Sequence, residues 1–328
     1  MINVGAGNIQ AIKVGIEDAT KAYQGDTLVW SKEHRVYTAM TCEYRILTAG
    51  TYQICSANAA AQQETIVVDG AEVPSTTALT FDVGTHEVEF PGIIAALEHG
   101  YFKEIDTLVV AHFPSTMVFM GPSVFYGCAN LEHADMSGTQ IASFNGHSFE
   151  NCSSLMEIKI SPVTTMVNGG EFYGCESVTS VTLNNVLTSI KEGAFYNNGR
   201  SSVSYPGIQI EFPASLKSIG FGAFSNARIN YVGLNEGLET IDGMAFYNTY
   251  PPDVWIPSTV TYIGDSAFGE VTASEIRFLS ATPPTFGTDV FYGRESPWGF
   301  SQGIKVPAAS VELYKAALPQ YADQIVGY

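Results

Sequence analysis

The sequence predicts a mainly β protein: a solenoid of about eight coils of 22–24 residues, preceded by a small β-sandwich and a short N-terminal β unit. Three observations support this prediction. Phenylalanine recurs at a nearly constant spacing over the last two-thirds of the chain. Each recurrence is followed by apolar residues that alternate with polar ones, as in strands with one buried face. Further alternating segments, separated by Gly, Asn and Pro, occupy the first hundred residues.

The composition agrees with a folded, strand-rich protein. Of the 328 residues, 45% are hydrophobic and only 15% are charged, while 31 Gly and 15 Pro favour short strands and turns over long helices. The formal net charge of −18 argues against a nucleic-acid partner, because phosphate binding needs a basic surface. No apolar run approaches the roughly 18 residues of a transmembrane helix, so no membrane insertion is expected.

Residues 1–32 are predicted to form the N-terminal β unit. Segments 9–15 and 20–30 have the pattern of strand, turn and strand. The chain starts without the basic region and the unbroken apolar stretch of a secretory signal. We therefore expect either a protein that is not exported by that route or one whose signal has been removed.

Residues 33–92 are predicted to form the small β-sandwich. Segments 51–55, 65–70, 79–83 and 86–90 alternate strongly and are bounded by turn-forming residues. Several short strands at this spacing are typical of a small, all-β unit.

Residues 93–305 are predicted to form the solenoid. A unit of about 23 residues is too small to fold alone, so stacking must bury its apolar edges. One phenylalanine per coil, with an apolar residue five positions earlier, is expected to supply the core. The eight phenylalanines lie 22–24 residues apart, except for one interval of 29: Phe125, Phe149, Phe172, Phe195, Phe224, Phe246, Phe268 and Phe291.

Residues 306–328 are predicted to cap the solenoid. Residues 304–307 have the pattern of a last strand, and residues 308–317 that of a short helix ended by Pro319. The expected role of this segment is to cover the open end of the stack.

The repeat pattern L-x-x-I-x-x-x-A-F-x-x-C-x-x-L-x-x-V-x-L resembles that of BspA-type leucine-rich repeats over residues 100–328. This family is common in surface proteins of gut and oral bacteria. The resemblance extends to segment 306–315, which is similar to the usual terminal segment of the family. It also extends to segments 68–70 and 84–88, which are similar to a short β-domain that often precedes such repeats. It implies that Cys128, Cys152 and Cys175, three positions after the phenylalanine, pack in the core. A disulfide between neighbouring coils is the alternative.

Residues 22–30 resemble N-terminal segments of tail and fibre proteins from phages of gut bacteria. The resemblance implies that this unit attaches the chain to the rest of a virion. A plain β-hairpin without an attachment role is the alternative.

No catalytic or metal-binding motif is found. The six histidines lack HxxxH and HExxH spacing, and the five cysteines lack CxxC. Glu192, Asp242 and Asp265 recur in the repeat turns and could be taken as the carboxylates of a glycosidase. Solvated turn residues are the simpler interpretation. We predict no enzyme activity, no cofactor and no metal.

The outward positions of the strands form the candidate binding face. The pattern predicts one column of Asp135, Lys159, Thr182, Gln209, Gly233, Trp255, Arg277 and Lys305. Trp255 and Arg277, with Tyr231 offset by one strand, would form an aromatic–cationic patch of the kind enriched in binding hot spots. Packing of Trp255 against a loop is the alternative. Two inserted loops, 197–207 and 293–303, add the candidate binding residues Arg200, Tyr205, Trp298 and Phe300.

These features predict binding by a rigid, acidic rod. The first hypothesis is a phage tail or fibre component in the virion. Its N-terminal unit would bind other virion proteins, and its repeats would bind a host surface protein or glycan. The alternative is a bacterial cell-surface or secreted adhesin, and a carbohydrate-active enzyme is a third hypothesis. The sequence leaves open whether the chain forms a homo-oligomer.

Overall fold

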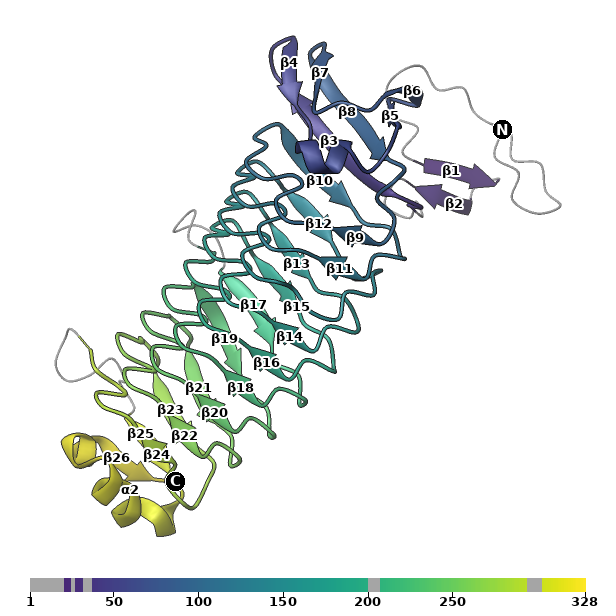
Figure 1. Ribbon diagram of the computed structural model, residues 1–328. Coiled ribbons are helices and arrows are strands. Elements are labelled where there is room, and N and C mark those ends of the chain that lie inside the picture. The colour runs from purple at the N-terminus through teal and green to yellow at the C-terminus, as the bar shows by residue number, and fades with distance from the viewer. Residues whose placement is uncertain (1–20, 25–26, 32–36, 200–206, 294–302) are drawn as a thin grey trace.

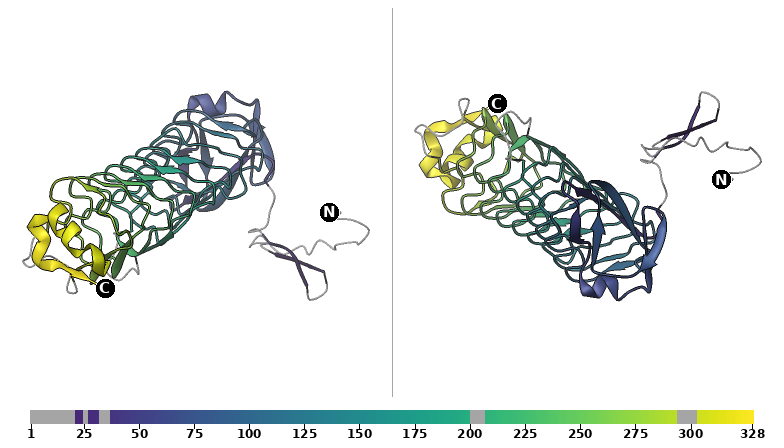
Figure 2. Two further views of the ribbon diagram at one scale, coloured as in Figure 1. Left: turned by 90° about the horizontal axis from the view of Figure 1, so that it is seen from below. Right: turned by 90° about the horizontal axis from the view of Figure 1, so that it is seen from above.

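A computed structural model of the chain describes residues 21–24, 27–31, 37–199, 207–293 and 303–328. Stacked coils form an elongated rod, with antiparallel strands at one end and a helical segment at the other (Figure 1). Views from below and above show the coils repeating along one direction (Figure 2). The predicted solenoid is therefore confirmed.

One side of every coil contributes a strand to a long sheet. Within the described residues this sheet has 14 strands, and its solenoid part is parallel throughout. These solenoid strands are β10 (Leu108–His112), β12 (His133–Asp135), β13 (Glu157–Lys159), β15 (Ser180–Thr182), β17 (Ile208–Glu211), β19 (Ile229–Gly233), β21 (Asp253–Ile256), β23 (Glu275–Phe278), β25 (Ile304–Val306) and β26 (Ile325–Gly327).

A second, shorter parallel sheet lines another side of the coils. Two isolated bridges, Met120 to Phe144 and Ser143 to Met166, connect its first pair of strands to the remaining six. Its strands are β9 (Ala96–Leu97), β11 (Phe119–Met120), β14 (Met166–Val167), β16 (Ser189–Ile190), β18 (Ser218–Ile219), β20 (Thr240–Ile241), β22 (Tyr262–Ile263) and β24 (Thr285–Phe286).

The core between the sheets is a continuous stack of phenylalanine rings. All eight predicted phenylalanines are at most 1% exposed, and neighbouring rings lie 5.1–6.1 Å apart with nearly parallel planes. Phe102 adds a further ring, 5.4 Å from Phe125 and tilted by 7°. The described solenoid therefore has one more coil than the sequence predicted.

The backbone explains a second regularity of the repeat. The residue two positions after the phenylalanine has a positive φ in each coil from Phe102 to Phe268. Asparagine occupies this position as Asn151, Asn197, Asn226 and Asn248, with φ between 54° and 61°. Asparagine tolerates the left-handed region better than most residues, so it can close this turn.

The N-terminal strands form small antiparallel sheets, one of which continues the long sheet. Strand β3 (Met40–Ile46) pairs antiparallel with β10 on one side and with β8 (Gly84–Phe90) on the other. Strands β5 (Thr65–Val68) and β6 (Ala71–Pro74) extend this sheet, while β4 (Gly50–Gln53) and β7 (Ala78–Phe81) form a small second one. A single helical turn, α1 (Ala57–Ala60), follows β4.

This N-terminal part covers the first coil. The Phe90 ring packs edge-on against Phe102, with ring centroids 5.3 Å apart. Before it, β1 (Lys21–Gln24) and β2 (Thr27–Ser31) form an antiparallel hairpin, as the sequence predicts for residues 20–30. The predicted strand at residues 9–15 lies outside the described residues.

The C-terminal segment packs against the last coil. After β25, η2 (Ala308–Ser310), α2 (Val311–Ala317) and η3 (Pro319–Gln324) lead to β26, which the sequence did not predict. Tyr314 and Tyr321 are buried, and the Tyr321 ring lies 5.5 Å from Phe291 at the end of the stack. Among the described helices, none has the length and apolar composition needed to cross a bilayer.

Candidate binding face

The outward side chains of the long sheet form two neighbouring columns. The strand register pairs Glu157 with Ser180, Ser180 with Gln209 and Gln209 with Tyr231, so these residues share the first column with Asp253 and Glu275. The second column contains His112, Asp135, Lys159, Thr182, Glu211, Gly233, Trp255, Arg277 and Lys305.

The predicted position of Gln209 is therefore wrong. It lies in the first column beside Tyr231, and Glu211 takes its expected place in the column of Lys159 and Trp255. Both Gln209 and Glu211 point outward from β17, so alternation along the chain cannot choose between them. The choice depends on the register with β15. The 29-residue interval of this coil prevents that register from being predicted from the sequence.

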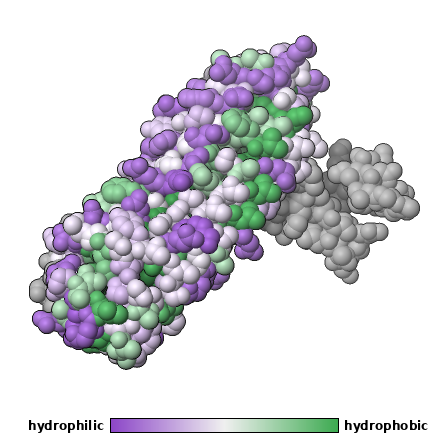
Figure 3. All heavy atoms as spheres, turned by 60° about the horizontal axis from the view of Figure 1, so that its bottom comes forward, coloured by the Kyte–Doolittle hydropathy of each residue, from purple (hydrophilic) through white to green (hydrophobic). Residues whose placement is uncertain are grey.

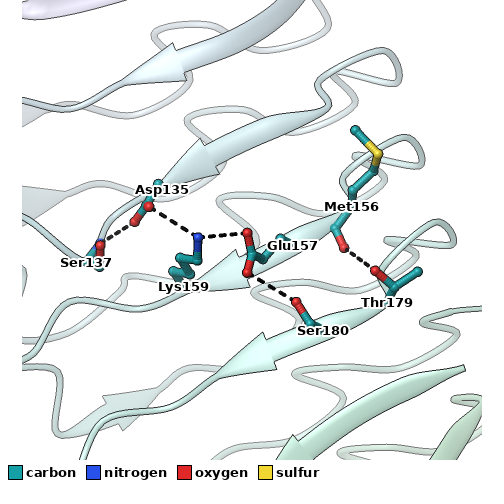
Figure 4. A network of polar contacts seen from close by, with 7 residues as sticks. All are labelled: Asp135, Ser137, Met156, Glu157, Lys159, Thr179 and Ser180. Carbon is teal, nitrogen blue, oxygen red and sulfur yellow. Dashed lines mark hydrogen bonds and ion pairs between the residues drawn. The ribbon is translucent and has the colours of Figure 1, made fainter. Parts of the chain in front are cut away.

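Lys159 is held by neighbours on the same face (Figure 4). Its Nζ lies 2.8 Å from Glu157 Oε2 and 3.6 Å from Asp135 Oδ2. The hydrogen bond to Glu157 raises the pKa of Lys159. Ser180 Oγ donates to the other Glu157 oxygen over 3.3 Å. The charge of Lys159 is thus compensated within the protein.

Three exposed aromatic rings lie toward the C-terminal end of the face. Tyr231, Trp255 and Tyr328 are 55%, 51% and 49% exposed, and we call them the aromatic strip. The Arg277 guanidinium lies 5.2 Å from the Trp255 ring centroid and 4.9 Å from that of Tyr328. The predicted contact between Trp255 and Arg277 is present, and the Trp255 ring stays about half exposed.

A groove runs between Tyr231 and Trp255. Gly233 forms part of its floor, and a Cβ at that position would fall 2.5 Å from Tyr231 Cε1. The groove holds about 630 Å³, within the usual range for ligand sites. Its lining residues are Glu211, Tyr231, Val232, Gly233, Leu234, Asn235, Pro252, Asp253 and Trp255.

The charges of this groove are negative. Glu211 and Asp253 are exposed, and within the described part of the chain no cation lies at ion-pair distance from either. An adjoining hollow of about 490 Å³ shares Glu211 and Tyr231 and adds Ser180, Thr182 and Gln209. We call the groove and the hollow together the aromatic groove.

The remaining predicted binding residues do not join the aromatic groove. Lys305 is half-buried and pairs with Arg277 and Val326 in the sheet, beyond Trp255. Arg200, Tyr205, Trp298 and Phe300 lie outside the described residues.

The turn carboxylates act on the local backbone. Asp265 accepts a 2.6 Å hydrogen bond from the backbone N–H of Thr288, which lowers the pKa of Asp265. Asp242 accepts a 2.7 Å bond from the N–H of Gly243. In the described residues, no group of three or more His, Cys, Asp or Glu could hold a metal ion.

The repeat cysteines form a ladder of buried thiols. Sγ of Cys128, Cys152 and Cys175 donates to the carbonyl oxygen of the phenylalanine in the preceding coil, over 2.8–3.2 Å. Burial raises the pKa of Cys128 to about 12 and raises that of the other two as well. All five cysteines are free, so the disulfide alternative is wrong.

One further groove escaped the sequence analysis. Gly170, Gly193 and Gly222 share a position two residues before the phenylalanine in successive coils, and they border a hollow of about 510 Å³. The stacked rings of Tyr173 and Tyr196, 4.8 Å apart, line this turn groove. The sequence does carry a signal for this groove. Three consecutive coils have this glycine, and in two of them a tyrosine follows the phenylalanine.

Comparison with known proteins places the chain in a family. The model of the BspA type leucine-rich repeat region matches residues 81–202 and 204–296 in six copies. No curated protein matches the chain.

Three solved structures are similar to the chain at low identity. A leucine-rich cell surface protein from Faecalibacterium prausnitzii is 17% identical, with a TM-score of 0.35, and the match covers 72% of this chain and 82% of that one. The pneumococcal vaccine antigen PcpA is 13% identical (TM-score 0.26; 72% and 85% covered), and a leucine-rich repeat protein from Bacteroides ovatus is 15% identical (TM-score 0.22; 76% and 89% covered).

None of these matches supports the predicted resemblance of residues 22–30 to phage tail proteins. The family model, in contrast, spans well over half of the sequence and coincides with the coils seen in the structure. The chain belongs to the BspA-type leucine-rich repeat family.

Proposed function

We propose that this chain is a non-catalytic recognition protein of a bacterial cell surface or its surroundings, and that it binds its partner through the aromatic strip. The observation that carries the proposal is the exposure of Tyr231, Trp255 and Tyr328 on one sheet face. Large aromatic side chains exposed together on one face are typical of interaction sites, whereas single exposed rings are common on any protein surface.

The scaffold supports binding because it holds Trp255 and Arg277 in place before a partner arrives. Trp255 and Arg277 occupy paired positions on β21 and β23, and Arg277 is fixed further by a 2.9 Å ion pair with Glu275. Little conformational entropy remains to be lost at such positions, which favours affinity. On the face in Figure 3, hydrophobic residues occur as separate groups among hydrophilic ones.

The buried thiols support a non-catalytic role. A cysteine nucleophile must reach its substrate as a thiolate, whereas Cys128, Cys152 and Cys175 are fully buried with raised pKa values. The surface location is supported by membership of a repeat family common in bacterial surface proteins.

Binding of the fluorescently labelled protein to intact bacteria and to cultured epithelial cells, measured by flow cytometry, tests the proposal. We expect saturable binding to at least one cell type and at least tenfold weaker binding after combined Tyr231→Ala and Trp255→Ala substitution. Tyr262→Ala, which removes a 37% exposed ring on the short sheet, serves as the control. Equal binding of the double variant would refute the role of the strip.

The location is tested separately by quantifying the protein in envelope fractions, culture medium and purified phage particles. We expect it in the envelope or the medium. Enrichment in phage particles would contradict this part of the proposal.

A further inference from the structure

We infer that the aromatic groove binds lysine or arginine side chains of a basic polypeptide segment in the partner. This inference rests on the proposed function, since it names the chemistry of the partner for the same face. It is carried by the combination of two exposed rings, two carboxylates without cations and a groove that extends across several coils.

The first step concerns the charges of the face. Lys159 is compensated by Glu157 and Asp135, and Arg277 is compensated by Glu275. In the described residues, Glu211 and Asp253 are left without a cation, and both line the aromatic groove. A negative potential therefore remains where the rings are exposed, and a cationic group would neutralise it.

The second step concerns the rings. The negative face of an aromatic ring attracts ammonium and guanidinium groups. The protein already uses this attraction at the next coil, where Arg277 lies 5.2 Å from Trp255 and 4.9 Å from Tyr328. The same arrangement is available to a cation from a partner, between Tyr231 and Trp255 and beside Glu211 and Asp253.

The third step concerns the length of the site. The groove and the hollow share Glu211 and Tyr231 and hold about 630 and 490 Å³. Beyond Glu211, the site continues along Gln209 and Ser180, whose polar side chains can pair with a peptide backbone. An extended segment with several basic residues fits this length better than a single small cation.

The fourth step concerns the alternative ligand. A neutral glycan could stack on Tyr231 and Trp255, but it would leave the charges of Glu211 and Asp253 uncompensated. The chain as a whole carries a net charge of −18, which attracts basic partners over a distance. Both arguments favour a basic segment over a neutral sugar.

The test measures binding of acetylated, amidated hexalysine and hexaarginine and of a neutral hexasaccharide to the full chain by isothermal titration calorimetry. We expect both peptides to bind, and the affinity to fall at least tenfold in the Glu211→Gln, Asp253→Asn double variant. The control is Glu192→Gln combined with Asp242→Asn, which removes the same charge from exposed turns elsewhere. The control should bind like wild type.

Two outcomes would overturn the inference: no binding of either peptide, whether or not the hexasaccharide binds, or equal affinity of the two charge variants for the peptides. The two sets of variants distinguish failure of this inference from failure of the proposed function. If the aromatic substitutions abolish cell binding while the Glu211 and Asp253 variant binds cells normally, the recognition role stands and the cationic partner is refuted.

Discussion

The Tyr231 ring lies over Gly233, two residues further along the same strand. A Cβ at position 233 would fall 2.5 Å from Tyr231 Cε1 and 2.9 Å from its Oη. Side chains two apart on a strand point to the same face, so the missing side chain of Gly233 leaves room for the ring. One glycine thus sets both the orientation of Tyr231 and the shape of the groove beside Trp255.

Gly233→Ala should therefore weaken partner binding about tenfold without unfolding the protein. The added methyl group would displace the ring of Tyr231, which is exposed and free to turn away, so the free energy of unfolding should change little. Cell binding and urea denaturation measure the two effects. Gly138→Ala is the matched control, because a Cβ there meets no atom within 4 Å. Unchanged binding of Gly233→Ala would show that the ring position is unimportant.

Phe195→Ala should destabilise the solenoid by about 3–5 kcal/mol, as expected for a fully buried phenylalanine. Its ring lies between Phe172 and Phe224 at 5.3 and 5.1 Å, so its loss opens a cavity in the middle of the stack. Phe221→Ala, which removes a 46% exposed ring in the next coil, should cost far less. The free energy of unfolding from urea denaturation measures both, and similar costs would contradict the stack as the main source of stability.

The coils could be predicted from sequence because each coil places one phenylalanine at the equivalent position in the core. The coil of Phe102 has the same pattern, although it was not among the eight predicted coils. Leu97 lies five residues before Phe102 and Leu108 lies six residues after it, as in later coils. The same pattern would have predicted this coil. The pairing of β3 with β10 could not be predicted, because the alternation of apolar and polar residues predicts strands and not their partners.

The site was less predictable than the fold. Trp255 and Arg277 could be paired from sequence because their coils have nearly equal length, whereas the longer coil before β17 hid the register of Gln209. The groove depends on where the Tyr231 ring turns, which is a property of side-chain packing. Nothing in the periodicity of the repeat specifies it.

The five thiols should be inert to Ellman's reagent in the folded protein. All five are buried, and burial raises the pKa of Cys55 and Cys128 to about 12, so almost no thiolate is available. In denaturant without reductant, all five should react. Fewer than five reactive thiols would reveal a disulfide and contradict the free cysteines of the ladder.

Met244→Gly should be more stable than Met244→Ala by about 1 kcal/mol. Met244 has φ of 55° at the position where the two preceding coils carry glycine, and its side chain is 38% exposed. Both variants remove the side chain, but only glycine relieves the left-handed backbone. Thermal or urea unfolding compares them, and equal stability would show that the turn tolerates a Cβ without strain.

Glu171 should make the protein less stable as the pH rises. Its carboxyl group is fully buried, Oε2 accepts a 3.1 Å hydrogen bond from the N–H of Gly146, and Oε1 has no hydrogen-bond partner in the described residues. Burial raises the pKa of Glu171 from 4.5 to about 8, so the folded chain keeps a proton that the unfolded chain releases. This contribution is complete below pH 4.5 and is lost progressively up to about pH 8.

Glu171→Gln isolates this effect, because the amide has nearly the same shape and does not titrate. Between those two pH values, the stability of wild type should fall relative to the variant by about 1.4 kcal/mol per pH unit. Urea denaturation of both proteins from pH 4 to pH 9 measures the difference, which also cancels the titration of every other group. Parallel curves over this range would mean that folding does not raise the pKa of Glu171, which contradicts the prediction.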